Sequence, residues 1–216
     1  MQSRAQNSRI SRRRFVKSGA AGSAALAAAI ASRSCGAAEE TVKIALVGCG
    51  SRGTAAVANV FSTGGPTKLY VMADLFSERI EFSRNYLAER FPNQVDVAPD
   101  RRFVGFDGFR KAMDAMGKGD VVILTAPPVF RPPHFDYAVK KDLHVFMEKS
   151  FAVDAPGIRR MLAAAESSQR EDLKVVGGLM WRHDRPREAF VAKMREVPIG
   201  QVMLMRRGII PFLLRG

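Results

Sequence analysis

The feature that most constrains the fold of this chain is a glycine-rich turn between an apolar stretch and a helical pattern. Residues 48–53 have the spacing G-x-G-x-x-G, directly after the apolar stretch Val42–Val47 and directly before a run of small residues. This context is typical of a dinucleotide-binding turn. The first glycine permits the bend, the second admits the pyrophosphate, and the third lets helix and strand pack closely. We expect the turn to bind through Gly48, Cys49, Gly50, Ser51, Arg52 and Gly53.

An acidic residue follows this turn at the distance typical of dinucleotide-binding proteins. Asp74 comes at the end of the next apolar stretch, 24 residues after Gly50, and roughly 20 are expected for the acid that binds the adenosine ribose. Its carboxylate would repel a 2′-phosphate, so the sequence favours NAD over NADP. Arg79 could relieve part of that repulsion, which leaves NADP open. An ordinary acid at the end of a strand is the alternative.

Short apolar stretches alternate with longer segments of helical period, which predicts βαβ units. The expected fold class is α/β, a Rossmann-type doubly wound parallel sheet followed by a truncated α/β second domain. Ser77, Asp107 and Asp154 are expected to cap helices, and the stretch around Pro99 has no regular pattern. Strands are expected at residues 42–47, 69–73, 121–124, 144–147 and 175–180, and helices at residues 54–61, 77–91, 107–116, 132–140 and 154–168.

Further candidate site residues lie at the carboxyl ends of the expected strands, where open α/β sheets bind ligands. Thr125 and Pro127 follow the strand at 121–124, and His134 begins the next helix near the same crevice. Glu148 and Lys149 end the following strand, where the lysine amine could exchange a proton with a substrate oxygen. A simple turn, a surface histidine and a solvated lysine are the respective alternatives.

Together these residues resemble the N-terminal signatures of one enzyme family. Their order and spacing are similar to those of the Gfo/Idh/MocA oxidoreductases, the family of glucose-fructose oxidoreductase and inositol 2-dehydrogenase. The resemblance covers about residues 41–208. It rests on the glycine turn at 48–53, Ala73-Asp74, Thr125-Ala-Pro-Pro with His134, the stretch His144–Lys149, and the segments 176–183 and 199–202.

The resemblance implies an NAD(P)-dependent enzyme that acts on sugars, polyols or their derivatives. Lys149 would be the lysine of the family's E-K-P motif, at the nicotinamide and the substrate. Asp74, Thr125, Pro127, His134 and Glu148 would join the glycine turn in binding the cofactor. The chain has Ser150 where the motif has proline, so the turn loses a fixed φ angle and Lys149 is held less firmly.

Three parts are expected along the chain. They are a targeting segment at 1–38, an NAD(P)-binding domain at 39–176, and the start of a substrate domain at 177–216, with a helix at 186–195 and a strand at 201–205. Members of the family carry an aspartate and a histidine in that second domain, and we expect this chain to end before both. We therefore expect a truncated chain or natural fragment that binds cofactor but turns over sugars poorly. Its apolar tail at 209–214 favours association, and a homo-oligomer stays open.

Charge and composition exclude several other classes of protein. The net charge is +13, but seven of the 34 basic residues and none of the 21 acidic ones lie in residues 1–38. The remainder carries 27 basic against 21 acidic residues, or +6, spread along the chain, so no nucleic-acid partner is expected. Two cysteines and three histidines without ligand spacing make a metal site unexpected.

Residues 1–38 have the composition of an export signal. Residues 11–17, S-R-R-R-F-V-K, resemble the twin-arginine signal, and an Ala/Gly-rich stretch follows at 19–31. That stretch is weakly apolar and shorter than the ~20 residues of a membrane span, so no stable membrane anchor is expected. A periplasmic protein is therefore expected. A basic disordered tail is the main alternative, and a lipoprotein signal at Cys35 is disfavoured by Arg33.

Two other functions remain open beside the oxidoreductase. One is a module that binds NAD without catalysis. The other is a redox-neutral, NAD-dependent glycosidase, since the resembled family includes such enzymes. A serine hydrolase is disfavoured, because Ser51 lies in the glycine turn with no neighbouring base.

The leader generates the first prediction. Replacing Arg12 and Arg13 together by lysine should trap the protein in the cytoplasm of a host with twin-arginine transport, because the pathway requires that arginine pair. Cell fractionation and immunoblotting measure the distribution. The matched control replaces Arg4 and Arg9, which lie outside residues 11–17. Unimpaired export of the Arg12/Arg13 variant would disprove the assignment.

Overall fold

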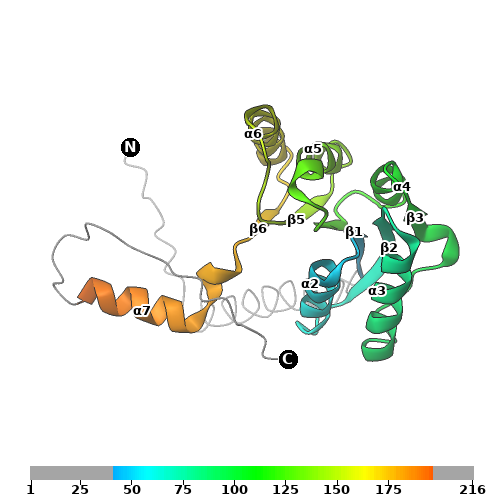
Figure 1. Cartoon of the computed structure of the whole chain (residues 1–216), viewed down its shortest axis with the longest axis horizontal. Coiled ribbons are helices and arrows are strands. Elements are labelled where there is room, and N and C mark those ends of the chain that lie inside the picture. The colour runs from blue at the N-terminus through cyan, green and yellow to red at the C-terminus, as the bar shows by residue number, and fades with distance from the viewer. Residues whose placement is uncertain (1–40, 197–216) are drawn as a thin grey trace, which may run out of the picture.

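A single parallel sheet organises the part of the chain that the computed structural model describes, residues 41–196. The expected leader at 1–38, strand at 201–205 and apolar tail at 209–214 lie outside the described residues. Within them, six strands pair in the order β3-β2-β1-β4-β5-β6, every pair parallel (Figure 1). The strands are β1 (Val42–Val47), β2 (Thr67–Asp74), β3 (Arg102–Val104), β4 (Val121–Leu124), β5 (His144–Glu148) and β6 (Val175–Gly178).

Helices cover both faces of this sheet. In Figure 1, α2 and α3 lie on one side of the strands, and α4, α5 and α6 lie on the other. The α/β, doubly wound fold expected from the sequence is therefore confirmed. The helices are α2 (Ser51–Phe61), α3 (Ser77–Arg90), α4 (Gly108–Asp114), α5 (Arg131–Lys140), α6 (Ala155–Arg170) and α7 (Arg185–Glu196), with short 3-10 turns η1 (Pro99–Arg101), η2 (Pro128–Phe130) and η3 (Met180–His183).

Alternate residues of each central strand enter two different cores. In β1, Ala45 and Val47 pack with α4, α5 and α6, whereas Ile44 and Leu46 pack with α2 and α3. Each of these four side chains is at most 3% exposed. A strand buried on both faces has a continuous apolar sequence instead of an alternating one. That property explains why β1 and β4 were predicted with the bounds that the structure gives.

The structure corrects several local expectations. β3 was not predicted, because three residues at the edge of the sheet are too few to display a strand period. Ser77 does not cap α3 but begins it, and Asp107 precedes α4 without a side-chain cap hydrogen bond. Asp154 does cap α6, because its carboxylate accepts a hydrogen bond of 2.7 Å from the Gly157 N–H.

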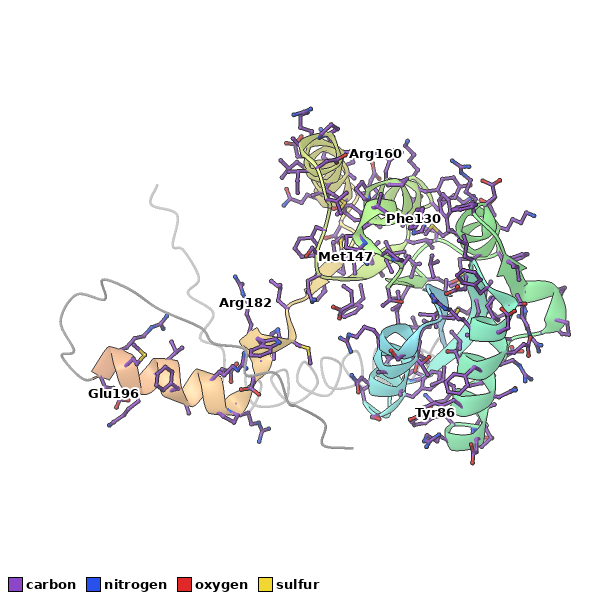
Figure 2. All side chains as sticks on the ribbon, in the orientation of Figure 1. Tyr86, Phe130, Met147, Arg160, Arg182 and Glu196 are labelled. Carbon is purple, nitrogen blue, oxygen red and sulfur yellow. The ribbon has the colours of Figure 1, made fainter. Side chains whose placement is uncertain are left out.

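The chain extends away from the sheet after β6. β6 ends at Gly178, two residues short of the strand expected at 175–180, and the chain then enters η3 and α7. Figure 2 shows Arg182 and Glu196 on this extension, far from Tyr86 on α3. No residue of α7 is buried. None of the helices within residues 41–196 is long and apolar enough to span a bilayer.

Candidate functional site

A cavity of about 480 Å³ opens at the carboxyl edge of the sheet. β1 lies between β2 and β4 there, so the strand order reverses at the place where such sheets bind ligands. Residues after β1, β2, β4 and β5 meet in the wall of this cavity because parallel strands all end at the same edge. The predicted residues that line it are Gly48, Gly50, Arg52, Asp74, Thr125, Pro127, His134, Glu148 and Lys149.

Three predicted residues of the glycine turn do not line this cavity. Cys49 and Ser51 instead border a second hollow of about 450 Å³ next to Glu78 and Arg79 of α3. The Cys49 thiol donates to the Ala73 carbonyl at 3.5 Å, and burial raises its pKa, so the sulfur is not a nucleophile. Gly53 is buried behind the turn.

The three glycines of the motif differ in whether the fold requires a glycine at that position. Gly48 has a φ of +97°, and a Cβ added there would lie 2.8 Å from the carbonyl carbon of Thr125. A Cβ at Gly53 would lie 2.6 Å from the Thr125 hydroxyl. Both positions therefore need glycine for the chain to fold. Gly50 has an ordinary φ of −70°, and a Cβ there would meet nothing within 4 Å.

Open space at Gly50 marks a position that the fold itself does not require to be glycine. Gly50 borders both hollows and directly precedes α2, which begins at Ser51. The first N–H groups of a helix have no partner within the helix and attract anions. A phosphate group could use this space only while residue 50 has no side chain.

Asp74 joins the turn after β1 to the turn after β2. One carboxylate oxygen accepts a hydrogen bond of 2.6 Å from the Cys49 N–H, and the other accepts one of 3.1 Å from the Phe76 N–H. The side chain is therefore fixed in the wall of the cavity. Sequence reasoning gave Asp74 a role towards a ligand but missed this role in holding the glycine turn.

Thr125 joins the same glycine turn to the end of β4. Its hydroxyl donates to the Gly48 carbonyl at 2.6 Å, and its N–H donates to the Val47 carbonyl at 2.9 Å. Pro127 follows it into η2 and lines the cavity. The β4 turn is thus held against the glycine turn.

Glu148 links the glycine turn to the end of β5. Its carboxylate forms an ion pair with Arg52, whose Nε donates to Oε1 at 2.7 Å. The other oxygen accepts from the Lys149 N–H at 3.2 Å. Glu148 is 5% exposed, and a Cβ at Gly178 would lie 2.9 Å from its carboxyl carbon. The acid thus fixes two sides of the cavity to each other.

Lys149 stands at the cavity wall directly after β5. Lys149 is exposed, whereas Glu148 before it is buried. The peptide bond between Lys149 and Ser150 is cis. The ammonium is the cationic group that the β5 turn presents to the cavity, and proton exchange with a bound hydroxyl is chemistry that such an amine can perform.

His134 lines the cavity and is buried among aromatic rings. It is 7% exposed, its ring centre lies 4.2 Å from that of Phe109, and Phe130 stacks on it at 6.1 Å. Burial, and then the charges of Arg131 and Arg110, lower its pKa to about 4. Its Nδ1 is buried without a hydrogen-bond partner among the described residues. His134 is therefore a neutral imidazole at physiological pH.

Sequence reasoning missed several residues of the cavity. Phe76 and Phe106 are 49% and 69% exposed at its wall, and Phe106 lies 6.1 Å from Phe130, which Figure 2 labels beside α5. Arg131 is 1% exposed. No signal in a single sequence identifies a buried arginine, because arginine is almost always exposed. The aromatic residues are isolated in the sequence and come together only in the fold.

Comparisons with known proteins agree with the fold. No family model matches the sequence, and no curated protein matches it. Among solved structures, myo-inositol 2-dehydrogenase from Lactobacillus plantarum matches with a TM-score of 0.58 at 21% identity, over 72% of this chain and 42% of that one. Scyllo-inositol dehydrogenase from Lactobacillus casei, with NAD(H) and scyllo-inositol bound, matches with a TM-score of 0.56 at 21% identity, over 72% and 42%.

A third solved structure extends the comparison to a reductase. A variant of a 3-ketoreductase from Actinomadura kijaniata, in complex with TDP-benzene and NADP, matches with a TM-score of 0.55 at 20% identity, over 76% of this chain and 45% of that one. These are proteins of the kind that the sequence motifs resemble, so the fold expected from that resemblance is confirmed. The chain spans about 42% of the length of the first of these structures.

The environment of His134 generates a prediction about pH. Its folded-state pKa of about 4 lies below the ordinary 6.5, so the unfolded chain takes up the proton first and folding stability falls as pH drops from 6.5 towards 4. His134→Gln removes this dependence, which amounts to at most about 3 kcal/mol. Urea unfolding at pH 7 and pH 4.5 measures the difference.

The matched control for this prediction is His183→Gln in the exposed turn η3. It should leave the pH dependence of the free energy of unfolding as in the wild type. An equal pH dependence in the wild type and in His134→Gln would contradict the assigned protonation state.

Proposed function

We propose that this chain is an NAD(P)-dependent oxidoreductase that transfers hydride between nicotinamide and a hydroxyl-bearing carbon of a sugar or polyol. The observation that carries the proposal is a single cavity that joins the glycine turn, Asp74 and Lys149. A phosphate-binding turn, a ribose-binding acid and a proton-exchanging amine are the three parts that such a reaction requires of a protein.

The cavity has features that suit a dinucleotide. Its volume of about 480 Å³ falls within the roughly 300–1,000 Å³ typical of small-molecule sites. Gly50 leaves space at the start of α2 for the pyrophosphate. Phe76 and Phe106 present exposed rings at the wall near Asp74, where a planar base could stack.

The cofactor preference proposed is for NAD. Both oxygens of Asp74 are held by backbone N–H groups, so the carboxylate cannot turn away from a 2′-phosphate in the same part of the cavity. Arg79 lies nearby, with its guanidinium 4.9 Å from the centre of the Phe76 ring. Among the structural neighbours, one holds NAD(H) and another NADP. The fixed acid in this chain favours the former.

Proton transfer is proposed for Lys149. The nicotinamide, when bound, accepts or supplies the hydride. During oxidation of an alcohol, the amine of Lys149 would take up the O–H proton as the carbonyl forms. During reduction, the same group would return the proton to the carbonyl oxygen. The ion pair of Arg52 with Glu148 holds the β5 turn beside the glycine turn, so Lys149 stays next to the cofactor site.

The substrate class comes from the chemistry of this step and from the neighbours. Scyllo-inositol is bound in one of them, and another is named a 3-ketoreductase. A secondary alcohol of a polyol and a sugar ketone are the two sides of the same hydride transfer. A sugar or polyol is therefore the substrate that we propose for this chain.

We further propose that the protein acts in the periplasm after export. The support is the segment S-R-R-R-F-V-K at residues 11–17. Twin-arginine transport carries folded proteins, and a domain that folds around its cofactor before export suits that route.

Cofactor binding tests the first part of the proposal. Gly50→Val should leave the thermal unfolding temperature nearly unchanged, because nothing lies within 4 Å of its Cβ, and should weaken NADH binding by roughly 100-fold or more. Asp74→Asn, which keeps an acceptor for the Cys49 N–H, should shift preference towards NADPH. Titration calorimetry with both cofactors measures the affinities.

The matched control for Gly50→Val is Gly65→Val. Gly65 lies before β2, at the opposite edge of the sheet, and its Cβ would meet only the Thr63 hydroxyl, at 3.8 Å. NADH affinity should be unchanged in this control. NADH affinity equal to that of the wild type in a folded Gly50→Val variant would rule out the assigned site.

Turnover tests the role of Lys149. We expect the full chain to oxidise members of a polyol panel only slowly, and Lys149→Ala to lower that residual kcat/KM by roughly 10²–10⁴ while NADH affinity stays within a few-fold. Lys174→Ala, an exposed lysine between α6 and β6, is the control. NADH binding without turnover of any polyol would indicate a binding module. Cleavage of glycosides without net NADH formation would indicate a redox-neutral glycosidase.

A further inference from the structure

A buried arginine stands at the start of α5, beside the cavity. Arg131 is 1% exposed and is among the largest fully buried side chains of the described residues. Burial lowers the pKa of its guanidinium, and the charge of Glu148 acts in the opposite direction. A guanidinium removed from water is costly unless its N–H groups find acceptors. The hydrogen-bond acceptors of the Arg131 guanidinium therefore indicate the role of this side chain.

All the acceptors of Arg131 are main-chain carbonyl oxygens at the edge of the cavity. Its Nη1 donates to the carbonyl of Glu148 and, at 2.9 Å, to that of Ser150. Its Nη2 donates to the carbonyl of Ala126. One planar cation thus connects the turn after β4 with the turn after β5.

Two of these acceptors lie on either side of Lys149 in the chain. A rigid, planar group that binds the carbonyl before and the carbonyl after one residue fixes the path of the backbone through that residue. The third bond, to Ala126, fixes this path relative to Thr125, whose hydroxyl holds the glycine turn at Gly48. The position of Lys149 relative to the glycine turn therefore depends on Arg131.

The turn at Lys149–Ser150, called the lysine turn below, needs such support in this chain. Lys149 is exposed, and its long, flexible side chain begins from a backbone that Ser150 does not restrain, since serine, unlike proline, leaves φ free. We propose that Arg131 is a positioning residue for Lys149, which fixes the Lys149–Ser150 turn against the β4 turn. The proposal rests on the proposed function only in assigning the substrate proton to Lys149.

Four variants of the full chain and one control variant test this proposal. Arg131→Met removes the guanidinium and keeps most of its length, and Arg131→Lys keeps the charge but replaces the two spaced nitrogens of the planar fork by one. Ser150→Pro keeps the carbonyl of residue 150 and fixes its φ angle. This substitution is made alone and in combination with Arg131→Met. Arg160→Met is the control, because this arginine is half exposed on α6 and pairs with Asp136.

Hydrogen exchange read by mass spectrometry measures the order of the lysine turn without any substrate. In Arg131→Met, the amides of residues 147–149, which belong to the end of β5 or donate to the Glu148 carboxylate, should exchange roughly tenfold faster or more, while those of β1 and β4 stay protected. Arg131→Lys should lie between this variant and the wild type. Adding Ser150→Pro to Arg131→Met should restore part of the protection, and Arg160→Met should exchange like the wild type.

Equal loss of protection throughout the sheet in Arg131→Met and in Arg131→Lys, with no recovery on adding Ser150→Pro, would show a general structural role and overturn the proposal. Unchanged exchange at 147–149 in folded Arg131→Met would overturn it as well. If Arg131→Met does not fold, Arg131→Lys with and without Ser150→Pro gives the same comparison.

Steady-state kinetics then connects the turn to chemistry. Arg131→Met should lower kcat by roughly 100-fold, as expected for misplacement of a catalytic group by about 1 Å, with NADH affinity within about threefold of the wild type. Ser150→Pro should recover part of kcat in the double variant. An unchanged kcat in folded Arg131→Met would overturn the proposal. A wild type without NADH binding or turnover would contradict the proposed function, whereas hydrogen exchange would still decide the role of Arg131.

Discussion

The contact between the turns after β1 and β4 is the interaction on which the rest of the site depends. Gly48, in a left-handed conformation, lets the chain pass within hydrogen-bond reach of Thr125, whose hydroxyl donates to the Gly48 carbonyl at 2.6 Å. A side chain at position 48 or 53 would push these turns apart. The strand order reverses between β1 and β4, where the ligand crevice of such sheets lies. The contact between Gly48 and Thr125 therefore sets the width of that crevice.

Charged side chains then hold the turns around this contact in place. Asp74 binds two backbone N–H groups, Glu148 bridges Arg52 and the Lys149 N–H, and Arg131 binds three carbonyls. A charged group removed from water is costly unless polar groups surround it, and each of these three has several hydrogen-bond partners, although the Nε of Arg131 has none within the described residues. The result is a rigid frame built from loops, which otherwise tend to move.

Most of the fold could be predicted from the sequence because buried parallel strands and amphipathic helices leave strong local patterns. β1 and β4 have the predicted bounds. β3 was missed because its three residues are ordered by pairing with β2, which is not a local property. Of the proposed site, the glycine turn and Lys149 were predicted through motifs. Arg131 was not found, because its partners are carbonyls, whose positions depend on the folded backbone and not on residue type.

The open space at Gly50 has a consequence for how this protein can change over generations. Folding makes strict steric demands on Gly48 and Gly53 but only the weaker demand of a helix N-cap on residue 50, since a side chain there would meet nothing within 4 Å. Selection for a folded chain alone would preserve the outer two glycines and let position 50 drift. Selection for ligand binding would preserve all three. The residue at position 50 therefore reports selection for ligand binding separately from selection for folding.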